Sequence, residues 1–135
     1  MAVLDEVATY LAANVTDTAL VVGTNLLLGR MPEDPSTCVA LFETGGRTPV
    51  DAFGASTLPA YARPRFQALV RAVSYPAAEA LATDVWRWVQ KIDNDTLTGV
   101  LWLRASAVQS PFALQRDDRD RMVFSCNYQV DRVVT

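Results

Sequence analysis

The clearest pattern of apolar and polar positions lies near the end of the chain. Between residues 122 and 131 every second residue is apolar, giving the set Met122, Phe124, Cys126, Tyr128 and Val130. A period of two is typical of a strand with one buried and one polar face. Residues 112–116 precede this segment across a polar tip, so 112–131 is a predicted β-hairpin in which Cys126 is a buried thiol.

Shorter apolar stretches predict further strands. Residues 20–22, 26–28 and 39–42 are apolar runs bounded by turn-forming residues. Residues 65–75 and 100–109 alternate with a period of two. In the latter segment the buried face is expected to carry Leu101, Leu103, Ala105 and Ala107, opposite Trp102, Arg104 and Ser106.

Two segments have helical spacing instead. Apolar residues recur every three or four positions between 4 and 14, which predicts a first helix there. The same spacing after Pro76 predicts a second helix over 77–92. Trp86 falls on the polar side of this helix, where it is either an anchor for a partner or a residue covered by a neighbouring loop.

Residues 43–63 have neither period. Glycines and prolines interrupt the segment, and loops of this length in compact domains are usually functional or disordered. It is therefore either a flexible surface loop or an arm that orders against a partner. Phe53, Leu58 and Tyr61 favour the arm, because a solvated loop rarely needs large apolar side chains.

Together these elements predict one α+β domain over residues 1–135. A mixed or antiparallel sheet of about five or six strands would have two helices on one face, with a long loop and a β-hairpin in addition. The other sheet face is expected to be polar, and either solvated or lining a wet cavity. It would carry Arg65, Gln67, Arg71, Arg104, Ser125, Asn127 and Gln129.

Composition removes several kinds of chemistry. The chain has 135 residues, half of them apolar, and no His, so it has no imidazole base, no Ser-His or Cys-His pair and no His-ligated metal. Cys38 and Cys126 are too few for a zinc site and are expected to be free thiols in a reducing cytosol. An acidic start and short apolar runs favour a soluble protein with no signal peptide and no membrane contact.

Charge is spread unevenly along the chain. Residues 1–60 carry seven acids and two arginines, a net of −5, and residues 61–135 carry ten basic residues and eight acids, a net of +2. Neither half has the basic stripe of a nucleic-acid-binding module. The acids at 117, 118 and 120 alternate with arginines, which disfavours a metal there. We therefore expect no metal, no cofactor and no enzyme activity.

Three stretches resemble one family. TNLLLGRMPEDPSTCVALFETGG (24–46), RPRFQALVRA (63–72) and QSPFALQRDDRDRMVFSCNYQV (109–130) are similar to phage minor capsid proteins understood as tail terminators of long-tailed phages. In that family an apolar strand, a Pro-containing turn and a second strand run into a Gly-Gly loop, and Gln-Ser-Pro opens the closing hairpin. Order and spacing agree along nearly the whole chain, whereas the N-terminal helix and the central loop match only in general character.

The resemblance implies a structural role. Such proteins form a ring, usually of six copies, at the head-proximal end of the tail tube, where the ring stops tube polymerisation. The implied partners are other copies, the tube protein and a head-completion or stopper protein, with double-stranded DNA passing non-specifically through the lumen. The implied location is the neck of the virion, after assembly in the host cytoplasm. The family implies no catalytic residue and no cofactor.

Within that role, two sets of residues are candidates for contacts. The candidate subunit or tube interface is Phe53, Leu58, Tyr61, Trp86 and Trp102. The candidate lumen or polar sheet face is Arg65, Arg71, Arg104, Asp117, Asp118 and Asp120.

Other interpretations remain open at this point. The nearest is a different neck component, such as a stopper or completion protein, or the equivalent in a gene-transfer particle. A more distant one is a small-molecule-binding or enzymatic α+β domain, which would need a pocket with converging polar groups. Arg65, Arg104 and Tyr128 are the candidates for such a pocket.

Overall fold

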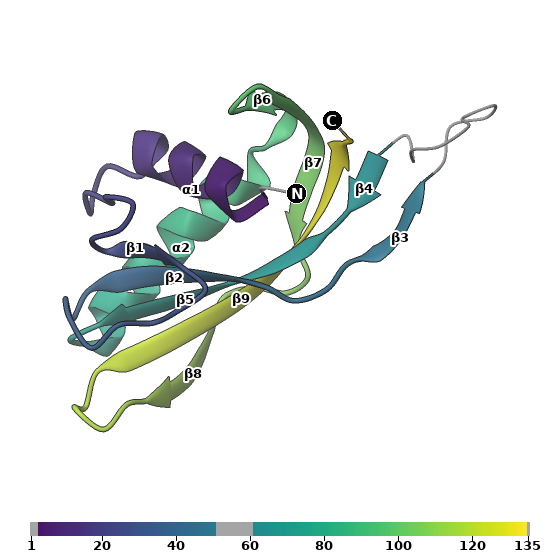
Figure 1. Cartoon of the computed structure of the whole chain (residues 1–135). Coiled ribbons are helices and arrows are strands. Elements are labelled where there is room, and N and C mark those ends of the chain that lie inside the picture. Colours follow the sequence, from purple (N-terminus) through teal and green to yellow (C-terminus); the bar gives the residue numbers. More distant parts are fainter. Residues whose placement is uncertain (1–2, 51–60, 135) are drawn as a thin grey trace.

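The computed structural model describes residues 3–50 and 61–134, and residues 1–2, 51–60 and 135 lie outside the described part. The described chain forms two helices and one sheet of nine strands (Figure 1). The elements are α1 (Val3–Asn14), β1 (Leu26–Leu28), β2 (Cys38–Glu43), β3 (Arg47–Val50), β4 (Tyr61–Arg63), β5 (Arg65–Ala72), α2 (Tyr75–Gln90), β6 (Asp93–Leu97), β7 (Val100–Ala107), β8 (Phe112–Arg116) and β9 (Met122–Val133).

Strand β9 is the centre of the sheet. Along one edge it pairs with β5 and then with β4, and along the other with β8 and then with β7. The order β1-β2-β5-β9-β4-β3 describes the main path, with β6 extending from β7. Only β1 and β2 pair in parallel among the described strands; the other pairs are antiparallel. The long alternating segment thus pairs directly with four of the eight other described strands.

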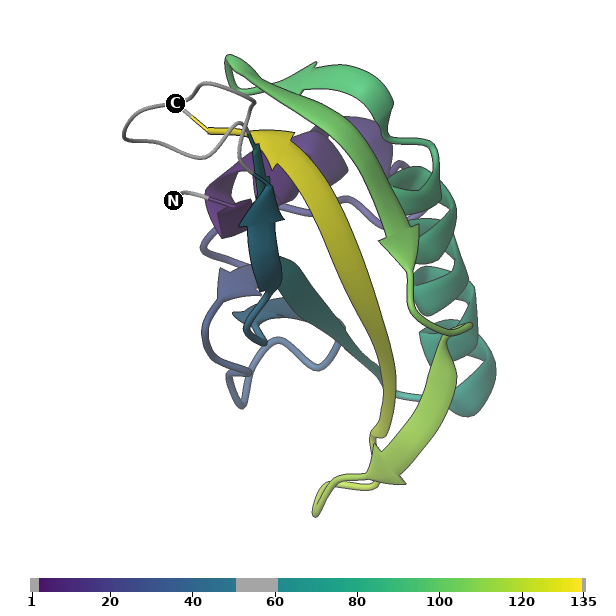
Figure 2. The same ribbon diagram turned by 90° about the vertical axis from the view of Figure 1, so that its right-hand side faces the viewer.

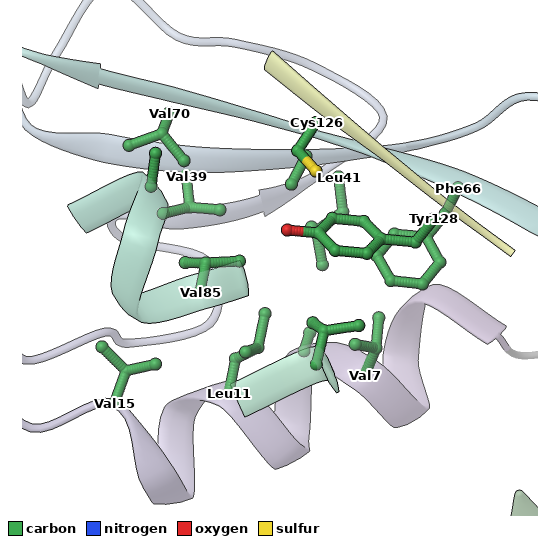
Figure 3. Packing of buried hydrophobic residues seen from close by; sticks show 14 of the residues in the cluster. Val7, Leu11, Val15, Val39, Leu41, Phe66, Val70, Val85, Cys126 and Tyr128 are labelled. Carbon is green, nitrogen blue, oxygen red and sulfur yellow. The ribbon is translucent and has the colours of Figure 1, made fainter. Parts of the chain in front are cut away.

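Both helices cover the same face of the sheet (Figure 2). α2 begins at Tyr75 because the side chain of Ser74 caps its N-terminus and Pro76 occupies the first turn. The core between the layers includes the stacked rings of Phe66 and Tyr128, whose centroids are 5.0 Å apart. Figure 3 shows these rings above Val7 of α1, in the cluster that joins helices and sheet.

The structure confirms the α+β class, with two helices and a mixed sheet of several strands. The sheet has more strands than the five or six expected, because β3, β4 and β6 lie in segments without a strand period. The strand expected at 20–22 is wrong: only an isolated bridge from Val22 to Leu26 forms there.

The sheet faces expected for Leu101, Trp102 and Leu103 are also wrong. The pairing register of β7 with β9 shifts between Trp102 and Arg104. A β-bulge adds one residue to a strand, so residues on either side of it change faces relative to simple alternation. Trp102 and Ala105 are therefore both buried, and Leu101 and Leu103 are only half-buried.

Candidate interaction surfaces

The sheet face opposite the helices, here called the outer face, is polar over the half that β7 and β4 occupy. The register places Arg65, Gln129 and Ser106 side by side, and places Arg104 opposite Asp131. Arg65 and Arg104 are exposed, as expected for this face. Neither side chain makes a hydrogen bond or ion pair within the described residues, which leaves two guanidinium groups free for a partner.

Strands β3 and β4 form an arm that projects from one end of the sheet (Figure 1). Arg63 Nε donates a 2.7 Å hydrogen bond to the carbonyl oxygen of Thr48 and so joins the two strands. Tyr61 is half-buried and pairs with Val50 on one side and Val133 on the other. The predicted contacts Phe53 and Leu58 lie outside the described residues. Part of the expected loop is therefore regular structure.

A cleft of about 280 Å³ lies at the root of this arm. Three arginines, Arg47, Arg63 and Arg65, are among its lining residues, together with one acid, Glu43. Gly46 borders it, and a Cβ there would lie 2.5 Å from the carbonyl oxygen of Arg63. This excess of positive charge suits an anionic group, because a guanidinium binds carboxylate or phosphate in two-pronged fashion.

The residues proposed for a small-molecule pocket do not come together. Arg65 lines the cleft, whereas Arg104 does not. Tyr128 is fully buried on the helix side, and its hydroxyl has no hydrogen-bond partner among the described atoms. Burial, with Cys126 beside it, raises the pKa of Tyr128 far above its usual range, so the hydroxyl stays neutral. The prediction that Arg65, Arg104 and Tyr128 line one pocket is therefore wrong.

Trp102 has an internal role instead of the expected exposed one. Its side chain is 0% exposed, and its indole Nε1 donates to Glu6 Oε1 at 2.6 Å. Arg132 donates to both oxygens of the same carboxylate, through Nε at 3.1 Å and through Nη2. This buried triad joins α1 to β7 and to the end of β9. Because a partner cannot reach Trp102, the structure corrects its assignment to an interface.

Arg71 is on the outer face as predicted, but it is only 3% exposed. The loop before β2 covers it, and its guanidinium donates to the carbonyl oxygens of Ser36 and Pro35 at 3.0 and 2.8 Å. Arg121, also buried, donates to the carbonyl oxygen of Glu33 in the same loop. These arginines hold a loop in place, so Arg71 is not available to line a lumen.

The acidic tip separates into structural and exposed carboxylates. Asp117 accepts hydrogen bonds from the backbone amides of Arg119 and Arg121 and from Arg121 Nε, the last at 2.7 Å. Desolvation alone would raise the pKa of Asp117, but these donors outweigh it and lower the pKa. Asp118 and Asp120 are exposed, and Asp120 lies 3.5 Å from Arg116. Only these last two carboxylates face outward.

The exposed side of the helices, with Asp17 and the residues of β6 that face them, is here called the helix layer. Trp86 is half-buried there and packs partly against the core. Burial raises the pKa of Asp84, and the charge of Asp17 raises it further, while Arg87 lowers it in part. The Lys91 ammonium lies 4.1 Å from the ring centroid of Trp88.

The burial of the charged side chains of Glu6, Arg121 and Arg132 was not predicted from the sequence. Arg132 was predictable from the alternation, because it continues the buried series one step beyond Val130. Glu6 carries no such signal, since an acid in the first turn of a helix is ordinary at the surface. Arg121 has none either, because a hairpin tip with mixed charges usually stays solvated.

Two features are absent from residues 3–50 and 61–134. No group of three or more His, Cys, Asp or Glu side chains is placed to bind a metal ion. No helix is both long enough and apolar enough to cross a membrane.

Comparison with known proteins gives both a family and a fold. The sequence profile of a family described as bacteriophage tail terminator protein matches residues 13–134. A chain from the virion of a native gene transfer agent particle has the same fold, with a TM-score of 0.67 and 20% identity over 97% of this chain and 94% of its own. A second solved structure has a TM-score of 0.53 and 15% identity over 93% and 94%. No curated protein is significantly similar.

Proposed function

Because this chain belongs to the bacteriophage tail terminator family, we propose that it ends the tail tube of a phage-type particle. Family membership makes the chain a structural protein of the virion tail. The observation that supports the finer proposal is the extent of the match, which begins at residue 13, near the end of α1, runs to residue 134 and includes every described strand. The terminator role therefore takes precedence over a stopper or completion role.

In this proposal six copies close into a ring at the head-proximal end of the tube. The ring contacts the tube protein on one side and a head-completion or stopper protein on the other, while DNA passes through the lumen. A closed ring of identical chains uses head-to-tail contacts, so each copy needs two different surfaces. The outer face and the helix layer supply two such surfaces, one rich in arginine and one rich in carboxylate.

The action of the ring is geometric. Its tube-facing surface would match the growing end, and its other surface would offer no site for the next tube subunit, so no bond is made or broken. The protein would then have no enzymatic role. We propose Tyr61, Trp86, Phe53 and Leu58 as contacts to neighbours or tube. We propose Arg65 and Arg104 as residues of the polar sheet face, and Asp118 and Asp120 as residues of the lumen or the polar sheet face.

Polymerising tail tube protein provides the test. Tube protein is allowed to assemble with and without this chain, and tube lengths are measured in negative-stain images. The expected result is shorter tubes, each with extra density at one end, at substoichiometric amounts of the chain. The control is the chain unfolded by heat. Tubes of unchanged length with bare ends would contradict the proposal.

A further inference from the structure

Charge is segregated between the two layers of the fold. On the outer face and arm the basic residues outnumber the acids, with Arg47, Arg63, Arg65 and Arg104 against Glu43, Asp93 and Asp131. On the helix layer the acids outnumber the basic residues, with Asp5, Asp17, Glu79, Asp84 and Asp95 against Arg87 and Lys91. The two faces are on opposite sides of one chain, so each has an electrostatic complement in a second copy.

The basic side is open to a partner. Arg65 and Arg104 have no side-chain bond within the described residues, whereas Arg47 forms a long ion pair with Asp131, at 3.8 Å, and Arg63 donates to the carbonyl oxygen of Thr48. The cleft beside Arg63 and Arg65 has room for a side chain that carries a carboxylate. The guanidinium groups of Arg65 and Arg104 therefore keep their capacity to bind an anion.

The acidic side has two carboxylates on α2, those of Glu79 and Asp84. Burial raises the pKa of Asp84, the charge of Asp17 raises it further, and Arg87 offsets only part of this effect. The ammonium of Lys91 lies against the ring of Trp88, so it is directed to an aromatic partner. A guanidinium from outside the chain would relieve the repulsion of Asp84 by Asp17.

Edge-to-edge pairing is a weaker alternative at two of the open strands. Pro49 interrupts the hydrogen-bonding capacity of β3, and β6 carries Asp93 and Asp95. Proline and charge on an edge strand discourage pairing with another chain. Contact between faces is therefore favoured at these places.

We propose that the outer face of one copy docks onto the helix layer of a second copy, with Arg65 and Arg104 facing its carboxylates. This interface rests on the proposed ring and specifies which surfaces build it. Because the two surfaces differ, the contact is head-to-tail and leads to a ring or an open chain of copies.

Charge reversal of each face provides the test, with self-association measured by analytical ultracentrifugation at low salt. One variant carries Arg65→Glu with Arg104→Glu, and the other carries Asp17→Arg with Glu79→Arg. Each variant alone is expected to associate at least about tenfold more weakly than the wild type, because like charges then face each other. An equimolar mixture is expected to recover wild-type association, since each reversed face then meets its complement.

Two controls separate the interface from other effects. Arg30→Glu with Arg116→Glu changes net charge as much as the first variant at residues outside both charged sets, and is expected to associate like the wild type. Position 104 faces Asp93 and Asp131, so a glutamate there would repel two carboxylates within the same chain. A second outer-face variant therefore carries Arg104→Gln in place of Arg104→Glu. Circular dichroism checks that each variant is folded.

Several outcomes would overturn the interface. These are wild-type association by either folded variant, failure of the mixture to recover, and a wild-type chain that remains monomeric at millimolar concentration. A further one is loss of binding to a DNA duplex by the outer-face variant with self-association intact, which would assign that face to DNA. Tube capping is measured separately, so a failed interface with intact capping leaves the terminator role standing.

Discussion

At the scale of single residues, the most consequential feature is the buried carboxylate of Glu6. It accepts from Trp102 and from Arg132, and all three side chains are shielded from water. A buried ion pair contributes little net stability, but removing one partner leaves an uncompensated charge. Replacing one charged member of the triad should therefore lower the free energy of unfolding more than replacing both.

We expect Arg132→Met to lower the free energy of unfolding by about 3–5 kcal/mol, because it leaves Glu6 charged and buried. The double variant Glu6→Gln with Arg132→Met should lose much less, since Gln still accepts from Trp102 and no charge is buried. Urea denaturation of both variants measures the difference. A double variant less stable than Arg132→Met alone would contradict this interpretation.

Asp117 gives a pH-dependent prediction. Its lowered folded-state pKa means that its ionised form contributes stability above the ordinary pKa of 3.8, and that this contribution is lost as pH falls below it. Asp117→Asn should therefore be less stable than the wild type at neutral pH, and the two should converge in acid. Thermal unfolding over a pH series checks this, with the exposed Asp118→Asn as the control that should follow the wild type.

Residue-level prediction from sequence fails where a local irregularity intervenes. Trp102 was assigned to the surface because strict alternation was extended through a position where β7 has a bulge. Arg71 was assigned to the correct face, but a loop distant from it in sequence covers that face. Neither the bulge nor the loop contact is encoded in the local period.

At the scale of elements, the arm formed by β3 and β4 was predicted only as an irregular loop. Its strands are short, exposed and interrupted by Pro49, so they have no alternation to detect. β6 is similarly polar. The elements with a buried face, such as β5, β9 and α2, were found because burial imposes the periods on which sequence reasoning depends.

Gly46 controls how the arm leaves the sheet. A methyl group at this position would lie 2.5 Å from the carbonyl oxygen of Arg63 and 2.8 Å from the Cα of Pro64, so backbone must move. We expect Gly46→Ala to cost about 1–3 kcal/mol, as overpacking does, and to loosen the arm. Limited proteolysis and thermal unfolding measure both effects. Thr44→Ala, an exposed neighbour, should change neither; equal behaviour of the two variants would contradict the argument.

At the scale of the whole molecule, the class of fold and the family were accessible from sequence, but the surfaces were not. Buried periodicity and the resemblance of residues 24–46, 63–72 and 109–130 both extend along the chain, and the family match covers the same range. The separation of charge between layers differs from the separation between chain halves, because the strands of the outer face come from distant segments. Only the three-dimensional arrangement brings those arginines together.

The central place of β9 also has a consequence for synthesis. β9 is translated after every strand with which it pairs, so β5 and β7 have no shared neighbour until the ribosome passes residue 133. Long-range pairing of this kind delays folding until late. A nascent chain released before β9 would lack the strand that joins its two halves and the Arg132 partner of Glu6. Incomplete copies would thus remain unfolded and would not enter an assembly as defective subunits.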